Sequence, residues 1–167
     1  MSNKLSARGM KLLKVFHLIF IMMWTMGVVF MSILNWKSET LLPRFNYNQE
    51  MGLFIDYVFV IPGAICAVIT GIIYGIKTNW GFFKYKWITV KWIIGILVII
   101  MGTFVLHPIA LDILSNTEFL PEKNYKIFLK DWYSEIVTLQ IMASIQAVAL
   151  LFLIVVSVYK PWMKKKK

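Results

Sequence analysis

Four long apolar runs, separated by polar stretches, dominate the chain. They cover residues 12–34, 53–76, 88–107 and 137–159, each close to the roughly 20 residues that a helix needs to cross a bilayer. Lipid offers the backbone no hydrogen-bond partners, so these runs are expected to be helices. The pattern predicts an all-α integral membrane protein: a four-helix up-down transmembrane bundle that forms one domain over residues 1–167.

The segments between the spans differ in length and character. Residues 36–49 are polar and include Pro43, so we expect an irregular external loop. Residues 108–136 carry apolar positions at helical spacing, which favours short amphipathic helices that cap the bundle outside or lead into the fourth span. Within the second span, Pro62 is expected to kink the helix.

The distribution of charge predicts the orientation. Thirteen of the 18 basic residues fall before the first span, between the second and third, or after the fourth: Lys4, Arg8, Lys11, Lys14, Lys77, Lys84, Lys86, Lys91, Lys160 and Lys164–Lys167. The other five share the opposite side with all eight acidic residues. By the positive-inside rule, both termini and the middle loop are cytoplasmic, as expected of a multi-pass protein of the bacterial cytoplasmic membrane.

Composition supports the membrane assignment and narrows the partners. The chain is 59% hydrophobic, has a mean hydropathy of +0.71 and carries a net charge of +10. Because topology explains the positive charge, we expect anionic lipid headgroups at the cytoplasmic face and no nucleic acid. A single cysteine, Cys66, excludes an internal disulfide.

The first span contains a histidine, and an ionisable group inside a membrane is a functional candidate. Trp24 follows His17 by two helical turns on the same face. Counted from the cytoplasmic surface, Lys91 near the start of the third span and Tyr74 near the end of the second reach a similar depth. These three residues, His17, Tyr74 and Lys91, form the predicted inner cluster, although Lys91 could instead extend to the headgroups.

Small residues recur at every fourth position of the second span: Gly63, Ala67, Gly71 and Gly75. The simpler interpretation is close packing of two helices. The alternative is a smooth wall for a flat ring, and the two are compatible.

Other polar residues have ordinary interpretations. His107 ends the third span at the outer surface, with Asp56, Glu135 and Gln140 as possible neighbours, and cannot share a ligand with His17. Gln140 and Gln146 are expected to form interhelical hydrogen bonds. The methionines Met22, Met23, Met26 and Met31 could bind Cu(I), but are more typical of apolar packing.

Three segments resemble parts of two groups of small bacterial membrane proteins. HLIFIMMWTMG, with His17 and Trp24, resembles the H-x6-W pattern of the HemJ-type protoporphyrinogen oxidases and the CopD-type copper proteins. VFVIPGAICAVITG and WITVKWIIGIL resemble the second and third helices of the HemJ type. The resemblance covers about half of the chain. It implies haem b as cofactor and functional roles for His17 and Lys91.

The resemblance also has a gap. The HemJ pattern continues with Leu-Pro-Arg and a second histidine, whereas this chain reads FMSILNWKSETL. The missing arginine is a natural partner for a porphyrin propionate, so its absence leaves the oxidase activity open.

Together these features predict a haem b-binding membrane protein acting in haem or porphyrin handling or in membrane redox chemistry. His17 would be the ligand of the haem iron, and Trp24 would pack on the haem ring. The small-residue stripe would let the ring approach the second span, and Lys91 and Tyr74 would contact the haem propionates. The alternatives are a HemJ-like porphyrinogen oxidase, CopD-like copper handling, and a non-catalytic subunit of a membrane complex. A second axial ligand, a homo-oligomer and a redox partner are left open.

Overall fold

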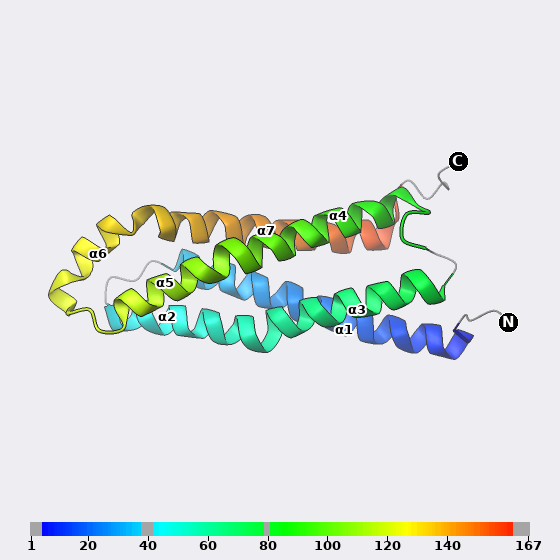
Figure 1. The fold of residues 1–167 in the computed structure, drawn as a ribbon, viewed down its shortest axis with the longest axis horizontal. Coiled ribbons are helices and arrows are strands. Elements are labelled where there is room, and N and C mark those ends of the chain that lie inside the picture. Colours follow the sequence, from blue (N-terminus) through cyan, green and yellow to red (C-terminus); the bar gives the residue numbers. More distant parts are fainter. Residues whose placement is uncertain (1–4, 38–41, 79–80, 162–167) are drawn as a thin grey trace.

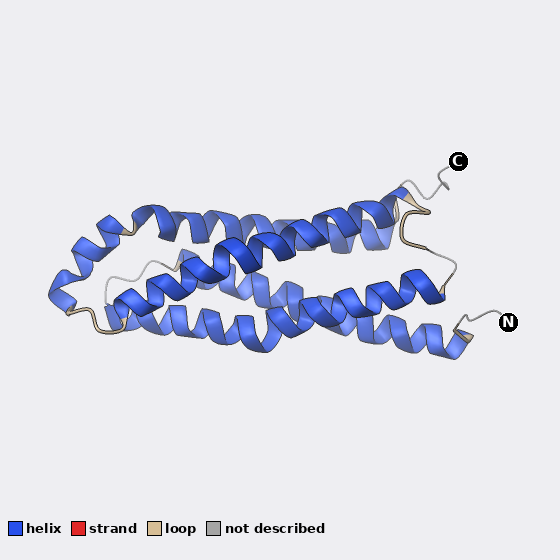
Figure 2. Cartoon of the chain, viewed as in Figure 1, coloured by secondary structure: helices blue, strands red, loops and turns tan. Residues whose placement is uncertain are grey.

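The computed structural model describes residues 5–37, 42–78 and 81–161. Lys4, Glu39 and Lys164–Lys167, which contribute to the charge pattern, lie outside the described residues. The described part of the chain is helical almost throughout (Figures 1 and 2). In chain order the elements are α1 (Ala7–Trp36), α2 (Leu42–Ile55), the π-helix η1 (Asp56–Val60), α3 (Ile61–Lys77), α4 (Lys86–Met101), the π-helix η2 (Gly102–Leu106), α5 (His107–Thr117), the 3-10 helix η3 (Glu122–Asn124), α6 (Tyr125–Asp131) and α7 (Tyr133–Tyr159).

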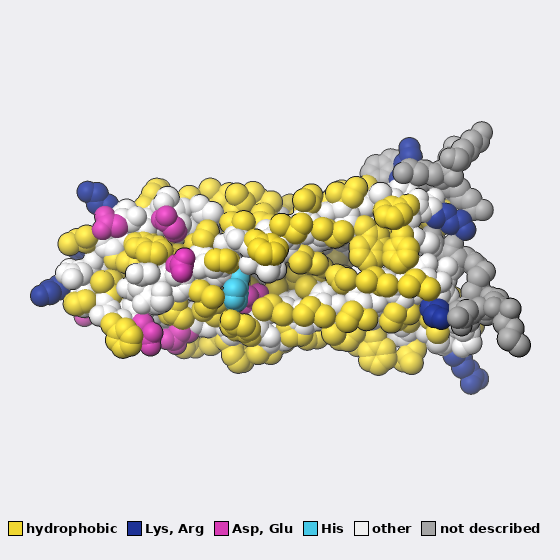
Figure 3. All heavy atoms as spheres, viewed as in Figure 1, with side chains coloured by type: hydrophobic (Ala, Val, Ile, Leu, Met, Phe, Trp, Pro, Cys, Tyr) yellow, Lys and Arg dark blue, Asp and Glu magenta, His cyan; other side chains and the backbone are white. Residues whose placement is uncertain are grey.

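Consecutive elements join into four long rods that lie side by side (Figure 1). They cover Ala7–Trp36, Leu42–Lys77, Lys86–Thr117 and Tyr133–Tyr159, and all four are long and apolar enough to cross a membrane. Large apolar side chains are exposed around the middle of the bundle, as lipid contact requires (Figure 3). The prediction of an all-α protein with four helices able to span a membrane is confirmed.

The two ends of the bundle differ in charge. We call the end that carries both termini the basic end, and the end that carries α6 the cap end (Figure 1). Acidic side chains gather toward the cap end (Figure 3).

The middle two rods have 36 and 32 residues, so they are about 54 and 48 Å long, well beyond the roughly 30 Å hydrocarbon core. A helix crosses the hydrocarbon core in about 20 residues. If the crossing begins at Lys77 in the second rod and at Lys86 in the third, it ends near Tyr57 and Leu106, so the rest of each rod extends beyond the core toward the cap end.

The prediction of an irregular loop over residues 36–49 is wrong for most of that segment. Residues 38–41 lie outside the described part, but α2 begins at Leu42, just before Pro43. A proline is tolerated in the first turn of a helix, where its missing N–H has no partner to lose. Leu42 and Phe45 are buried, and burial of this apolar face stabilises the helix despite its polar composition.

The two middle rods share a local irregularity. Each contains a five-residue π-helix that ends two residues before a proline, Pro62 in one rod and Pro108 in the other. The Ile61 N–H bonds to the Asp56 carbonyl, five residues back, where an α-helix would bond four back. The rod bends where α2 passes into α3 (Figure 1), so the predicted kink near Pro62 is confirmed.

Two separate apolar cores fill the bundle. The basic-end core joins α1, α3, α4 and α7 through Trp24, Val28, Ala67, Val98, Ala147, Leu150 and Leu153. The cap core joins α2, η2, α5, α6 and α7 through Leu42, Phe45, Leu106, Ile113, Tyr125, Phe128, Leu139 and Ala143. The cap is therefore a packed extension of the rods with its own core.

Polar side chains tie the rods together between these cores. Gln146 Nε2 donates to the Val98 carbonyl at 2.8 Å, and Gln140 Nε2 donates to the Asn35 carbonyl at 3.0 Å. The predicted interhelical role of both glutamines is confirmed. Gly102 makes room for the first bond, because a methyl group there would lie 2.9 Å from Gln146 Nε2.

Candidate functional site

His17 extends from α1 toward α3, where its ring is fixed by Thr70. His17 Nδ1 lies 2.7 Å from Thr70 Oγ1. The Thr70 hydroxyl also lies 2.7 Å from the Cys66 carbonyl and 3.0 Å from the Ala67 carbonyl. When Thr70 donates to one of these carbonyls, its oxygen accepts from His17 Nδ1, and Nε2 then keeps its lone pair.

Tyr74 and Lys91 lie beside His17, as the depth argument predicted. The rings of His17 and Tyr74 meet edge to face with centroids 5.8 Å apart, and the Tyr74 hydroxyl donates to the Met10 carbonyl at 3.3 Å. Lys91 is close enough to His17 to interact with it electrostatically. Its ammonium also lies 5.8 Å from the centroid of the Trp87 ring. The inner cluster is thus assembled, while the roles of its members stay predictions.

The small-residue stripe of α3 serves two different purposes along its length. A methyl group on Gly63 would lie 2.7 Å from the Trp24 backbone nitrogen, so at this end the stripe allows α1 and α3 to approach closely. Ala67 and Trp24 are both buried in the basic-end core. Trp24 packs between helices, two turns away from His17, and its predicted role beside the haem ring stays a prediction.

Aromatic rings cover the other end of the stripe. A methyl group on Gly71 would lie 3.6 Å from the Trp92 indole and 3.8 Å from the His17 ring. One on Gly75 would lie 2.5 Å from the Phe82 ring, and the Phe82 and Trp92 rings are 5.7 Å apart. Flat rings do lie on this wall, but they belong to the chain itself.

Thr70, Phe82 and Trp92 are the residues of this site that the sequence analysis missed. Thr70 could have been found from the sequence, because a hydroxyl inside an apolar span needs a hydrogen-bond partner and Thr70 lies next to Gly71 of the stripe. Trp92 directly follows Lys91 in the chain. Nothing in the sequence indicates that Phe82, in the loop before α4, returns to cover Gly75.

The residues around His17 fit haem b, the cofactor that the resemblance implies. With Nδ1 donating to Thr70, the Nε2 lone pair is free for a ligand, as in a proximal haem histidine. Gly71 and Gly75 offer a wall without side chains, and their aromatic cover is only half buried.

Two of the methionines of α1 lie on the outer surface of the bundle. Met22 and Met26 are 62% and 49% exposed on the apolar surface, the position expected of lipid-facing side chains. Among residues 5–37, 42–78 and 81–161, no group of three or more His, Cys, Asp or Glu side chains is placed to hold a metal ion.

His107 belongs to a different site near the cap end. Its Nδ1 lies 2.8 Å from Asp56 Oδ2, and its Nε2 lies 3.4 Å from the Tyr57 hydroxyl. Asp56 is thus the predicted neighbour that the fold supplies. Glu135 is not such a neighbour, since it accepts a hydrogen bond from Ser134. His17 and His107 lie in separate sites, as expected.

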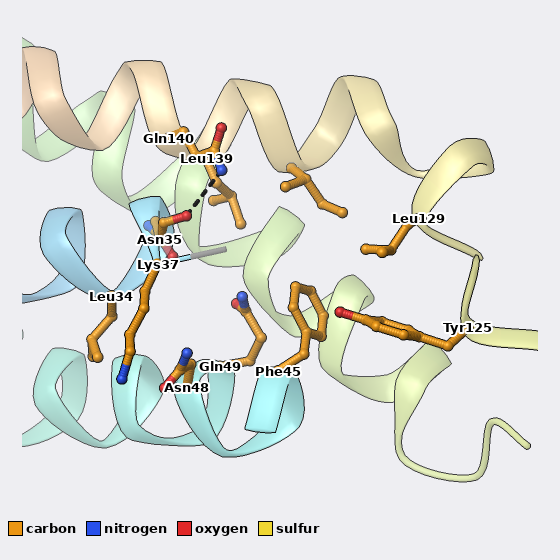
Figure 4. A pocket seen from close by; sticks show the side chains of 11 residues that line it. Leu34, Asn35, Lys37, Phe45, Asn48, Gln49, Tyr125, Leu129, Leu139 and Gln140 are labelled. Carbon is orange, nitrogen blue, oxygen red and sulfur yellow. Dashed lines mark hydrogen bonds between the residues drawn. The ribbon is translucent and has the colours of Figure 1, made fainter. Parts of the chain in front are cut away.

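Next to this pair the bundle is hollow. One cavity of about 40 Å³ is lined by Asp56 and His107, and another of about 90 Å³ lies farther toward the cap end. Figure 4 shows Gln49 and Asn35 at the larger cavity, with the Gln140 amide bonded to the Asn35 carbonyl. The sequence analysis missed this polar interior because Gln49 was placed in an irregular loop.

Comparisons with known proteins add no family to these observations: no family model, curated protein or solved structure matches the chain.

Proposed function

We propose that this chain is a haem b-binding integral membrane protein, with the haem held by His17 in the half of the bundle next to the basic end. It would act in haem or porphyrin handling or in membrane redox chemistry. The observation that carries the proposal is the hydrogen bond from His17 to Thr70, at 2.7 Å. An imidazole that donates from Nδ1 to Thr70 has the tautomer that an iron ligand needs, inside a mostly apolar span.

The wall of α3 supports the same assignment. Gly71 and Gly75 present backbone where other residues would present side chains, and Trp92 and Phe82 cover them. Both rings are half buried, so each can turn toward lipid without emptying the core. Bound haem would supply a one-electron redox centre. His17 would hold the iron, and the two glycines would let the ring approach α3.

The surrounding charge suits the propionates of haem. Lys91 lies near His17 and close to the basic end, where Lys77, Lys84 and Lys86 also lie. In the proposed topology the four spans cross alternately and both termini are cytoplasmic, because the basic residues gather at that end. The same residues would attract anionic lipid headgroups of a bacterial cytoplasmic membrane.

The test is an optical titration of the purified full chain with haem, in the oxidised and the dithionite-reduced states. We expect a saturable Soret band at one haem per chain. His17→Ala should remove it, while His107→Ala should leave it intact. A colourless protein that stays colourless with added haem would refute the proposal, and so would loss of the band only in His107→Ala.

The binding wall can be tested independently of the ligand. Gly71→Leu places a branched side chain against the wall and should weaken haem binding. Gly95→Leu makes the same change on α4, at a glycine with no atom within 4 Å of an added methyl group. Equal affinity in the two variants would mean that the ring does not lie against α3.

Three alternatives remain distinguishable. Conversion of a porphyrinogen by the haem-loaded protein, lost in Lys91→Met, would indicate a HemJ-like oxidase. Stoichiometric copper without haem would indicate a CopD-like function. A protein that binds neither would fit a non-catalytic subunit of a membrane complex.

A further inference from the structure

The two cavities near the cap end lie next to each other and share part of their lining. Asn35, Gln49 and Leu139 line both of them, so the cavities adjoin. Their volumes of about 90 and 40 Å³ exceed the roughly 10–15 Å³ that one water molecule requires. We call this space, with Asn35, Gln49, Asp56, His107 and Gln140 among its lining, the amide chamber.

Gln49 indicates that the chamber holds water. The residue is only 9% exposed, and its side chain has no hydrogen-bond partner within the described part of the chain. It points into the larger cavity (Figure 4). A buried amide without a partner costs about 1–3 kcal/mol, and water in the adjoining space removes that cost. Asn35, which is half buried, lines the same space, and its backbone carbonyl accepts from Gln140.

Asp56 and His107 form the ionisable side of the chamber. Asp56 is 8% exposed, and its Oδ2 accepts from His107 Nδ1 at 2.8 Å. This bond leaves two positions that can take another proton: the second carboxylate oxygen of Asp56, and His107 Nε2 beside the Tyr57 hydroxyl. An ionisable pair at the membrane boundary that also contacts a hydrated cavity can exchange protons with it.

Few other charges face the pair. From the rod of α2, η1 and α3 come Asp56 itself and Tyr57. The described residues that α1 and α7 contribute to the smaller cavity are Met31, Asn35, Leu139 and Ala143, none of which titrates. Lys37 lines the larger cavity, and Asp112, on the same helix as His107, is exposed.

We propose that the amide chamber is a water-filled pocket and that Asp56 and His107 together bind a proton supplied by this water. A hydronium ion in the chamber gives its proton to the pair and leaves as water, and no bond other than the O–H bond breaks. This site is independent of haem binding at His17.

The geometry of Gly52 provides a way to block the chamber. Gly52 lines the smaller cavity, and a methyl group added there would meet no atom within 4 Å. Gly52→Leu should therefore place apolar atoms in this space, and its Cβ meets no neighbour. Gly95→Leu is the matched control, because its added methyl group also meets nothing within 4 Å but lies on α4, away from the chamber.

The experiment uses the full chain in lipid nanodiscs, labelled with ¹⁵N-histidine, since the chain has only two histidines. His107→Gln assigns the signals. We expect the signals of the His107 ring nitrogens to respond reversibly when the bulk pH is changed. The Nδ1–H should exchange with water, and Asp56→Asn should change its hydrogen-bonded signal.

Gly52→Leu decides whether the chamber supplies the proton. We expect the water exchange of the His107 Nδ1–H to be lost in this variant and retained in Gly95→Leu. The hydrogen-bonded Nδ1–H signal in the same spectrum shows that the pair is intact. Ring nitrogens that ignore bulk pH would overturn the proton site. Unchanged exchange in Gly52→Leu would overturn the chamber route, because water would then arrive at the surface beside Tyr57.

Discussion

The crossing of α1 and α3 at Gly63 permits a sharp test of the fold. The perturbation is Gly63→Ala, which adds one methyl group. That group would lie 2.7 Å from the Trp24 backbone nitrogen and 3.1 Å from both the Phe20 carbonyl oxygen and the Trp24 Cα. All three are backbone atoms, so relief requires α1 and α3 to move apart.

The expected magnitude follows from two opposing terms. Overpacking of this kind costs about 1–3 kcal/mol. Replacing glycine by alanine inside a helix stabilises it by roughly 0.5–1 kcal/mol. Gly95→Ala should show the second term alone, since its methyl group meets nothing within 4 Å. The difference between the two variants therefore isolates the overpacking cost, about 1–3 kcal/mol in favour of Gly95→Ala.

The assay is reversible unfolding in mixed micelles of a mild and a denaturing detergent, followed by helical circular dichroism. Each variant is compared with the unaltered chain under identical micelle composition. If Gly63→Ala and Gly95→Ala proved equally stable, the two backbones would not be in contact at Gly63, and the reasoning would be refuted.

Three further substitutions test other parts of the structure. Thr70→Val removes the hydroxyl that orients His17 and should weaken haem binding about 10–100-fold, measured by optical titration, whereas Thr70→Ser should restore it. An unchanged haem affinity in Thr70→Val would mean that haem binding does not depend on the orientation of the His17 ring. Gln146→Leu removes the bond to the Val98 carbonyl and should cost about 0.6 kcal/mol, at most about 1.7, in the same unfolding assay; a gain in stability would argue against that bond. Ile113→Ala empties a fully buried position of the cap core and should cost about 2–5 kcal/mol, seen as faster amide hydrogen exchange in α5 and α6; uniform acceleration over all the rods would show that the two cores unfold together.

The sequence predicts the spans well because the physical rule behind them is simple. A run of about 20 apolar residues identifies each membrane crossing, and polar residues inside a span find partners. His17, Tyr74 and Lys91 could be grouped from helical rise alone, since depth along antiparallel helices depends only on residue number. Gln140 and Gln146 were predictable for the same reason that an amide in lipid needs a hydrogen bond.

The cap and its chamber were not predictable in this way. The polar sequence LPRFNYNQE has little helical periodicity of its own, and α2 is stabilised by burial of Leu42 and Phe45 in the cap core. That burial depends on α5 and α6, far along the chain. The cover of Gly71 and Gly75 likewise depends on side-chain directions between α3 and α4, which helical spacing does not determine.

The π-helix at Asp56–Val60 sets the rotational phase between the two halves of its rod. One extra residue in an α-helix turns everything beyond it by about 100° around the helix axis. With this insertion, Gln49 on one side faces the chamber while Gly63 on the other side faces α1. Deleting a single residue within η1 would restore a regular helix and turn these two surfaces out of alignment. Removing or adding one residue here would thus prevent the chamber surface and the α1-facing surface of this rod from packing correctly at the same time, while the length and hydropathy of the chain stay almost unchanged.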